Sequence, residues 1–397
     1  MSQHNWTSEN LLERLIGFDT TSTRSNLELI DFVRNLLDDH GIDSQLVPSE
    51  DQTRANLYAT IGPDDIGGVM LSGHTDVVPT TGQDWQSDPY RMQRGDEYLT
   101  GRGACDMKGF IACVLATLPA LRATELKLPV HLAFSYDEEI GCVGARRLVE
   151  SMQGFAVRPR IGLIGEPTDM AMVLGHKGKL SFRVTVTGLS CHSAYISQGV
   201  NAVEYAAELI AYIRGMNRRV REQLLDDSYS VPHSTFHVGN ITGGTALNIV
   251  PRQCSFEFEI RNLPQQDLQA LAHDIRHYAS DVLLPQMREG FDEADIRFDE
   301  LSYYPGLRTD PAATVIEYTR TINPIDRIGD NVSFGTEAGL FTDLGIDCLV
   351  CGPGSIEQAH KPDEYVSREQ MAYCDQMLEN LVQRCRDSSS VDTPDKT

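Results

Sequence analysis

The residues best suited to catalysis are histidines and carboxylates that stand at the ends of short apolar segments. In the first such motif, the apolar run Val69 to Leu71 is followed by Ser, Gly, His74, Thr and Asp76. Residues two apart in an extended chain point the same way, so Asp76 can accept a hydrogen bond from the far ring N–H of His74. Metal-binding histidines are often oriented by a carboxylate in this way. An isolated His-x-Asp sequence is more often a surface histidine beside a turn, so the other motifs must decide.

A second motif places three acids after an apolar segment. The run Val130 to Ser135 is followed by one tyrosine and then by Asp137, Glu138 and Glu139. Consecutive acids at the end of a strand repel one another unless a cation lies among them. Because neighbouring residues of an extended chain face opposite ways, we expect Glu138 and Glu139 to have different roles.

Three more candidate ligands occur elsewhere in the chain. Glu166 follows the apolar run Ile161 to Ile164, and His360 lies in a loop after the apolar run that begins at Asp347. Asp106 lies in a glycine-containing loop before an apolar helix, where it could alternatively cap that helix. The loop does not bind a dinucleotide, because Asp106 occupies the third glycine position, and no Walker loop occurs. Together these residues indicate a pair of divalent metal ions with nitrogen and oxygen ligands, zinc being the first choice.

Composition narrows the class of protein. The 397 residues are 41% hydrophobic and carry 34 basic and 57 acidic side chains, a formal net charge of −23. This charge repels nucleic acid and anionic membranes and is compatible with a cationic or zwitterionic small substrate. The sequence shows neither a signal segment nor an apolar run of membrane-spanning length, so we expect a soluble, cytoplasmic protein. Nine scattered cysteines do not indicate a disulfide framework, and Cys348-Leu-Val-Cys351 is more typical of buried strand thiols than of a redox or zinc pair.

The elements that must position these ligands alternate between strands and helices. Apolar periodicity predicts a first helix that ends near Gly17, and a second whose start is marked by a capping box, Ser25-x-x-Glu28. Apolar strands then alternate with helices, which indicates a mixed, largely parallel sheet flanked by helices. The strands are expected at 55–61, 69–72, 130–135, 161–164 and 347–351, and the helices at 107–121, 143–151, 311–322 and 368–385.

Between Lys179 and Gly306 the pattern changes to half-exposed strands and amphipathic helices. The predicted order β-α-β-β-α-β is that of the ferredoxin-like split motif, a compact α+β unit. We therefore predict a discontinuous catalytic domain, 1–179 and 306–397, with a domain inserted at 180–305. The predicted strands and helices of the insert are 180–186, 201–213, 235–241, 254–260, 266–284 and 294–298.

Taken in this order, the motifs resemble the M20 family of dinuclear metallo-amidohydrolases and peptidases, over the chain from the first helix to about Cys385. The resemblance implies two divalent ions per subunit, zinc first and cobalt as an alternative. It implies a cis peptide bond after Asp106, Asp106 as the bridging carboxylate, Glu138 as the general base, and Asp76 in its orienting role. The remaining implied ligands are His74 and Glu166 for one ion and Glu139 and His360 for the other.

The inserted domain is similar to the family's lid and dimerisation domain, which implies a homodimer. In Ser190-Cys-His192-Ser-Ala194 it has a histidine where the family stabilises the oxyanion from the partner subunit. A solvent-facing loop histidine is the alternative. Asn248 and Arg261 match substrate-contacting positions, and a guanidinium suits an α-carboxylate. Arg261 could equally form an ion pair on a strand surface.

Several segments resemble the branch of the family that deacetylates N2-acetylated ornithine, including Gly73 to Pro79, Gly352 to Tyr365 and Thr336-Glu337-Ala338. We hypothesise that Glu337 receives the cationic end of such a substrate; the alternative is a carboxylate that caps the following helix. Other N-acyl-amino-acid deacylases, succinyl-diaminopimelate desuccinylases and dipeptidases of the same family remain alternatives. From another class, the alternative is a non-catalytic metal-binding homologue, which would have no need of a general base such as Glu138.

Overall fold

The computed structural model describes residues 6–392, and these divide into two compact units. Unit 1 contains the described parts of Met1–Gly175, Leu307–Asp330 and Thr336–Thr397, and unit 2 contains His176–Gly306 and Asn331–Gly335. The sequence did not predict that 331–335 would leave the catalytic unit. Within unit 2, Val332 forms a β-bridge with His176 and Asn331 forms one with Tyr229, which explains why this stretch belongs there.

Unit 1 is built on a mixed, largely parallel sheet, as predicted, and the sheet has one strand, β1, that the sequence did not predict. Its strand order is β1-β2-β6-β3-β7-β14, with parallel pairing from β6 to β14 and antiparallel pairing of β1 and β2. The bounds are β1 (Ser44–Pro48), β2 (Ala55–Ile61), β3 (Val69–His74), β6 (Val130–Ser135), β7 (Ile161–Ile164) and β14 (Asp347–Val350). The central strands β3, β6 and β7 are buried throughout, as expected of parallel strands covered on both faces.

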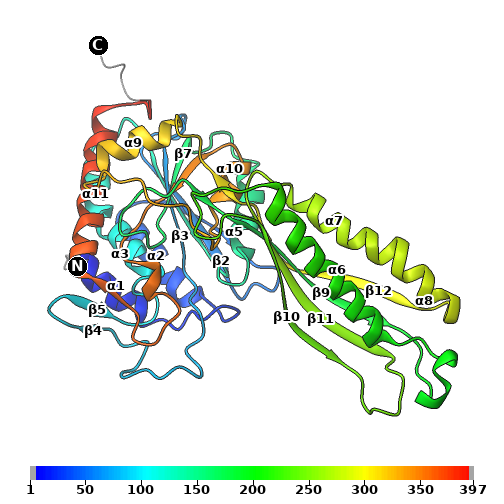
Figure 1. Ribbon diagram of the computed structural model, residues 1–397. Helices are drawn as coiled ribbons and strands as arrows, with labels where there is room; N and C mark the ends of the chain where they lie inside the picture. Colours follow the sequence, from blue (N-terminus) through cyan, green and yellow to red (C-terminus); the bar gives the residue numbers. More distant parts are fainter. Residues whose placement is uncertain (1–5, 393–397) are drawn as a thin grey trace. The chain divides into compact units, whose positions relative to one another are not determined.

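Helices cover both faces of this sheet (Figure 1). On one face lie α2 (Leu27–Asp39), α3 (Lys108–Ala116) and α9 (Thr314–Ile322), with α1 (Ser8–Ile16), α4 (Leu118–Ala123) and α11 (Arg368–Asp387) packed against them. On the other face lie α5 (Val143–Met152) and α10 (Ala338–Asp343). Short strands β4 (Gln93–Arg94), β5 (Tyr98–Thr100) and β15 (Tyr365–Ser367) form a separate small sheet. Among the described residues, no helix combines the length and apolarity needed to span a bilayer.

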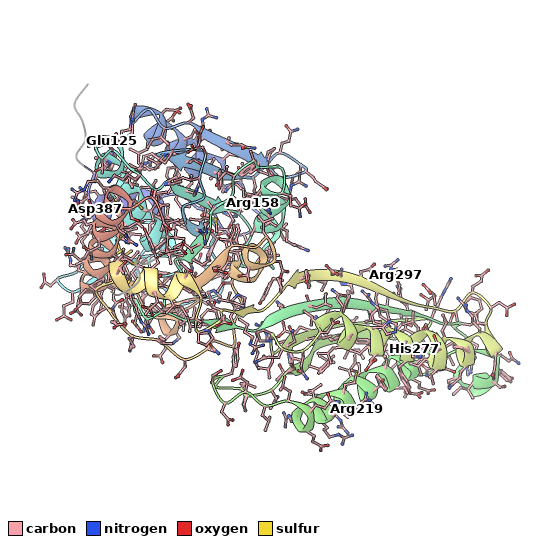
Figure 2. The ribbon with its side chains drawn as sticks, turned by 90° about the horizontal axis from the view of Figure 1, so that it is seen from above. Glu125, Arg158, Arg219, His277, Arg297 and Asp387 are labelled. Atoms are coloured by element: carbon pink, nitrogen blue, oxygen red, sulfur yellow. The ribbon has the colours of Figure 1, made fainter. Side chains whose placement is uncertain are left out.

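Unit 2 has the predicted order of a ferredoxin-like motif. Its antiparallel sheet runs β10-β11-β9-β12, and α6, α7 and α8 pack on it around one apolar cluster. The bounds are β9 (Gly178–Thr187), α6 (Ala202–Gln223), β10 (Thr235–Gly243), β11 (Gln253–Asn262), α7 (Leu268–Tyr278), α8 (Leu284–Gly290) and β12 (Asp295–Tyr304). In Figure 2, Arg219 marks α6, His277 marks α7 and Arg297 marks β12.

Short elements complete the two units. Strands β8 (Gly175–His176) and β13 (Leu307–Arg308) pair with each other. The 3-10 turns η1 (Ser193–Gln198) and η3 (Ile356–Gln358) lie in loops, and the π-helical turn η2 (Ala279–Leu283) joins α7 to α8. The sequence predicted none of the short strands and 3-10 turns, because segments this short have no clear periodicity. The single helix predicted over 266–284 includes α7 and η2 and ends where α8 begins.

Several predicted helices differ in their limits. The helix predicted over 107–121 is two helices, α3 and α4, that break at Thr117, because Pro119 in the first turn of α4 has no N–H to continue the hydrogen-bond ladder. Helix α6 extends ten residues beyond its predicted end at Ile213, since Met216 and Val220 continue its buried face.

The capping box predicted for the second helix was wrong. Helix α2 begins after Asn26, and neither Ser25 nor Glu28 makes the reciprocal bonds of that motif. Asn26 is buried, and its side chain bonds across the structure instead. The amide donates to the carbonyl of Ala55 and to the hydroxyl of Thr75, and its oxygen accepts from the Ala55 N–H. Asn26 therefore ties the start of α2 to the sheet.

This difference predicts contrasting effects of two neighbouring substitutions. Asn26→Ala leaves buried partners without a hydrogen bond, so we expect the free energy of unfolding to fall by about 1–3 kcal/mol. Ser25→Ala removes an exposed side chain and is expected to change it by less than about 0.5 kcal/mol. Urea denaturation of both variants measures the difference. Equal destabilisation by the two substitutions would restore the capping-box interpretation.

Candidate metal centre

His74 is the last residue of β3, and its buried ring lies between two carboxylates. Its Nε2 is 2.9 Å from Oδ1 of Asp106 and 3.7 Å from Oε1 of Glu166. Glu166 follows β7, the next strand of the sheet, so the parallel pairing of β3 with β7 brings these residues to the same edge.

Asp106 lies between the two histidines. Its second oxygen, Oδ2, is 3.3 Å from Nε2 of His360, so one carboxylate faces both imidazoles. Nε2 of His360 is also 3.0 Å from Oε2 of Glu139, which follows β6. The peptide bond between Asp106 and Met107 is cis, as the resemblance implied.

These side chains form two overlapping groups that could each hold a metal ion. One group is His74, Asp106 and Glu139, and the other is His74, Glu138 and Glu166; within each group the ligand atoms all lie within 4.8 Å of one another. All five residues predicted from the sequence as ligands therefore converge, since His360 contacts both Asp106 and Glu139. Glu138 lies in the same cluster, and its Oε1 accepts a bond from the Cys142 thiol at 3.3 Å.

Asp76 supports the centre differently from the prediction. The nearest acceptor to Nδ1 of His74 is the backbone carbonyl of Asp76, at 2.9 Å, while the Asp76 carboxylate is 3.5 Å away. That carboxylate accepts the backbone N–H groups of Glu138 and Glu139 and the Ser22 hydroxyl. Asp76 thus orients the His74 ring through its main chain. Through its side chain it holds the loop of consecutive acids at 137–139, called the acidic loop below.

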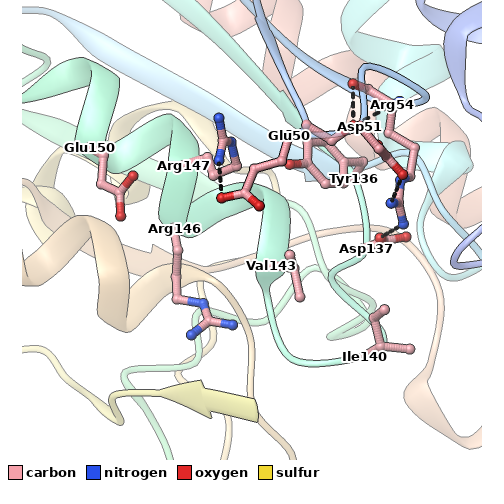
Figure 3. A pocket seen from close by; sticks show the side chains of 11 residues that line it. Glu50, Asp51, Arg54, Tyr136, Asp137, Ile140, Val143, Arg146, Arg147 and Glu150 are labelled. Carbon is pink, nitrogen blue, oxygen red and sulfur yellow. Dashed lines mark hydrogen bonds and ion pairs between the residues drawn. The ribbon is translucent and has the colours of Figure 1, made fainter. Parts of the chain in front are cut away.

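Asp137, the first of the three consecutive acids, bonds outside the cluster. Figure 3 shows Arg54 between Asp51 and Asp137, in the lining of a pocket to which Tyr136 and Ile140 also belong. Asp137 has a left-handed backbone with φ of 51°, and its other oxygen accepts the Thr23 N–H. The three acids are therefore divided between an outer ion pair and the inner cluster.

Glu337 occupies a position that does not favour its predicted contact with substrate. Its side chain is buried, and its oxygens accept bonds from the hydroxyls of Ser72 on β3 and Ser135 on β6, at 2.5 and 2.6 Å. Glu337 stands at the start of α10, but its side chain makes no capping hydrogen bond. The alternative role, a carboxylate that caps this helix, is therefore not seen either. In this geometry Glu337 ties together the two strands that carry His74 and the acidic loop.

The three candidate residues of the inserted domain lie in unit 2. His192 is exposed and caps the turn η1 by accepting the Ala194 N–H. It lies beside Asn248, whose carbonyl accepts the Ser193 N–H. Arg261, on β11, pairs with Glu259 on the same strand, which matches the alternative of a surface ion pair.

The cluster holds more negative charge than its histidines compensate. Burial raises the pKa of Glu138 to about 8 and that of Glu139 to about 7, and burial also raises the pKa of Glu166. Hydrogen bonds to Asp106 and Glu139 raise the pKa of His360 to about 10. Each shift opposes the charge state in which these groups would bind a metal. The glutamates are raised because burial and neighbouring carboxylates disfavour their charged form, and His360 is raised because the carboxylates beside it favour the imidazolium.

The residues present fit a pair of divalent cations. Imidazole nitrogens and carboxylate oxygens are the donors that zinc accepts. The two groups share His74, and Asp106 could act as a bridging carboxylate because its two oxygens face different histidines. Cations there would neutralise the buried carboxylates, which the protein otherwise leaves beside one another. The donor chemistry and the excess negative charge therefore agree.

The sequence did not reveal the residues that hold the loops carrying Asp106, Glu138 and His360. Arg102 and Glu364 form a fully buried ion pair, and Cys142 contacts Glu138. Each lies within four residues of a predicted site residue, but only the long-range contacts distinguish them from ordinary neighbours. An arginine and a glutamate beside conspicuous ligands were the only available signal.

Comparison with known proteins identifies the family of this chain. The model of peptidase family M20/M25/M40 matches residues 70–384. The chain is 34% identical over 376 residues to an acetylornithine deacetylase of Myxococcus xanthus, covering 94% of this chain and 95% of that protein. It is 32% identical over 370 residues to one of Pasteurella multocida (strain Pm70), covering 92% and 93%. The chain belongs to the M20 family. It is therefore a hydrolase of this group of metallopeptidases and amidohydrolases.

The solved structures agree on the fold of this M20 hydrolase. The M20 family metallo-carboxypeptidase Sso-CP2 from Sulfolobus solfataricus matches with a TM-score of 0.73 and 17% identity, over 98% of this chain and 100% of that one. The mixed sheet flanked by helices, predicted from the alternation of strands and helices, is confirmed.

The raised pKa values predict that metal-free protein loses stability as the pH rises. In the folded state Glu139 and Glu138 retain protons up to about pH 7 and 8, whereas in the unfolded chain they lose them near the ordinary value of 4.5. The unfolded state then binds fewer protons, so the free energy of unfolding falls as the pH rises across this window. Bound metal displaces these protons and should flatten the dependence.

Urea denaturation between about pH 5 and pH 8, with chelator and with zinc, measures this difference. Replacing Glu138 and Glu139 together by glutamine should flatten the dependence of the metal-free protein. Equal slopes with and without metal would contradict the expectation.

The position of Glu337 gives a separate prediction. Glu337→Gln weakens the bonds to Ser72 and Ser135, so we expect the free energy of unfolding to fall by about 1–3 kcal/mol. The ratio of kcat/KM between acylated amino acids with cationic and with neutral side chains should stay unchanged. A large fall in that ratio, measured beside a Ser72→Ala control, would instead support substrate contact.

Proposed function

We propose that this M20 hydrolase removes the acetyl group from N2-acetyl-L-ornithine, releasing L-ornithine and acetate. The observation that carries the proposal is the similarity of nearly the whole chain to two acetylornithine deacetylases. The clustered ligands support amide hydrolysis by a two-metal centre, and the acidic surface suits a cationic substrate. As parts of this proposal, we place the reaction in the cytoplasm as a step of arginine biosynthesis, and we expect a homodimer.

Two divalent ions, zinc or cobalt, would be held by His74 and Glu166 on one side and by Glu139 and His360 on the other, with Asp106 between them. When bound, such ions polarise an amide carbonyl and lower the pKa of water to near neutrality. We assign zinc first because the donor set mixes imidazole and carboxylate.

In this proposal Glu138 is the general base. Glu139 is within hydrogen-bond reach of His360, which favours it as a ligand, whereas Glu138 has the Cys142 thiol as its neighbour. Its carboxylate takes one proton from the attacking water and returns it to the departing amine, so the amide C–N bond breaks with the charges balanced. A raised pKa suits this task, because the acid form must give the proton back near neutral pH.

Residues of unit 2 complete the proposal. His192 would stabilise the oxyanion in the partner subunit's site, and Asn248 and Arg261 would contact the substrate. The exposure of His192 and its position beside Asn248 are compatible with these roles. Arg261 would have to exchange Glu259 for a substrate carboxylate, which a guanidinium can do because both partners are carboxylates.

A substrate panel on zinc-reconstituted protein tests the function. We expect kcat/KM for N2-acetyl-L-ornithine to exceed that for N-succinyl-diaminopimelate and N-acetylmethionine by about tenfold or more. Preference for either of the other substrates would assign the protein to a desuccinylase or to a broader deacylase, and dipeptide cleavage to a dipeptidase. No turnover of any substrate would favour the non-catalytic homologue.

Glu138→Gln provides the mechanistic control in the same assay. It should retain both metal ions and lose about 10²–10⁴-fold in rate. The matched variant Glu125→Gln, at the exposed acid labelled in Figure 2, should retain full activity. Undiminished turnover by Glu138→Gln would overturn the mechanism.

A further inference from the structure

Glu364 is a buried carboxylate that accepts hydrogen bonds from four N–H groups. It follows His360 by four residues in the same loop and is 1% exposed. Oε2 accepts Nη1 of Arg102 at 2.7 Å and the backbone N–H of Gly103 at 2.9 Å. Oε1 accepts the backbone N–H groups of Cys105 and Asp106, both at 2.9 Å. Burial and the nearby Asp106 carboxylate raise the pKa of Glu364, and the Arg102 guanidinium and the backbone N–H groups of Gly103 and Asp106 oppose that rise by stabilising the charged form.

The glycine-containing loop before α3 curls around this carboxylate. Successive backbone N–H groups of such a loop form a concave anion site, a geometry that other proteins use for phosphate. Gly103 has φ of +80°, and a Cβ there would lie 2.8 Å from Cγ1 of Val77, so this turn requires glycine. The glycine-containing loop thus binds an internal carboxylate, Glu364.

Arg102 extends the contact from Glu364 to the backbone of His360. Its guanidinium lies over the Trp85 ring at 5.0 Å and donates to Oε1 of Gln83. Nε2 of Gln83 donates in turn to the carbonyl of His360 at 2.9 Å. Arg102 also donates to the carbonyl of Lys361, the residue after His360. Glu364 therefore holds the backbone of Asp106, while Arg102, through Gln83, holds the backbone of His360.

His360 needs such support more than His74 does. His74 ends a buried strand, whereas His360 lies in a loop, has a left-handed backbone with φ of 62°, and has a side chain that is 53% exposed. The separation of 3.3 Å between Asp106 Oδ2 and His360 Nε2 depends on how the two loops are fixed to each other. Glu364 belongs to the loop of His360, and its side chain bonds to the loop of Asp106.

We propose that Glu364 is a positioning residue that sets the separation of Asp106 and His360, and so sets the affinity for the metal ion that these two residues and Glu139 would hold. The inference rests on the proposed two-metal centre and adds to it a residue without any metal contact. It also assigns a role to the Arg102–Glu364 pair. Breaking a buried pair of this kind leaves one charge uncompensated, which displaces the groups bonded to it.

Zinc titration of chelator-treated full-length protein tests the inference by calorimetry. Wild-type protein should bind two ions. In Glu364→Gln the side-chain N–H₂ group would face backbone N–H donors. We therefore expect the affinity for the ion held by Asp106, Glu139 and His360 to fall about 10–100-fold, and the affinity of the His74–Glu166 site to change by less than about threefold. Arg102→Lys keeps the positive charge but loses the guanidinium hydrogen bonds to Gln83 and Lys361. It should lower the affinity for the same ion by a smaller factor.

The matched control is Asp375→Asn, which alters a part-buried carboxylate on α11 that accepts from Ser8, away from the ligands. It should bind both ions as the wild type does. Unchanged affinity for both ions in folded Glu364→Gln and Arg102→Lys overturns the inference and leaves the proposed function standing. If Glu364→Gln does not fold, Arg102→Lys alone decides. A wild-type protein that binds fewer than two ions overturns both.

Discussion

The structure depends on the confinement of like charges that come from the ends of β6 and β7 and from the loop before α3. Asp106, Glu138, Glu139 and Glu166 lie within one buried cluster in which the two histidines are the only cationic partners found in the described structure. Such a cluster is unfavourable by itself, because burial and mutual repulsion both oppose ionisation. It persists because the surrounding fold fixes it, and because its donor atoms suit cations that would remove the repulsion.

The fold fixes this cluster with a second group of carboxylates that bond to the protein itself. Asp76 holds the backbone of the acidic loop, Asp137 pairs with Arg54 on its outer side, and Glu337 joins the hydroxyls of β3 and β6. Glu364 holds the loop of Asp106 in the same way. Each has donors for both of its oxygens from groups outside the cluster, whereas Asp106 and Glu139 face the imidazoles of His74 and His360, which are themselves candidate metal ligands.

This division explains why neighbouring acids in the sequence have different physical roles. Asp137 and Glu138 are adjacent, yet Asp137 has a left-handed backbone and bonds outward, while Glu138 lies in the cluster. His360 and Glu364 share one loop, and the histidine faces the other ligands while the glutamate faces backbone amides. The N–H donors around each carboxylate, rather than its position in a motif, distinguish a candidate ligand from a structural acid.

The sequence by itself determined five of the six strands of the main sheet, the buried faces of the longer helices and the set of residues that meet at the candidate metal centre. Those features have local signals, because an apolar run or a helical period is read within a dozen residues, and the parallel strands then place their carboxyl ends at one edge. The tertiary structure alone decided that Asn26 rather than Ser25 anchors α2, that Glu337 faces two serines, and that Glu364 binds the loop of Asp106. These contacts join residues that are far apart in the sequence, and hydrogen-bond partners at that separation leave no local pattern because they depend on how the packed elements meet.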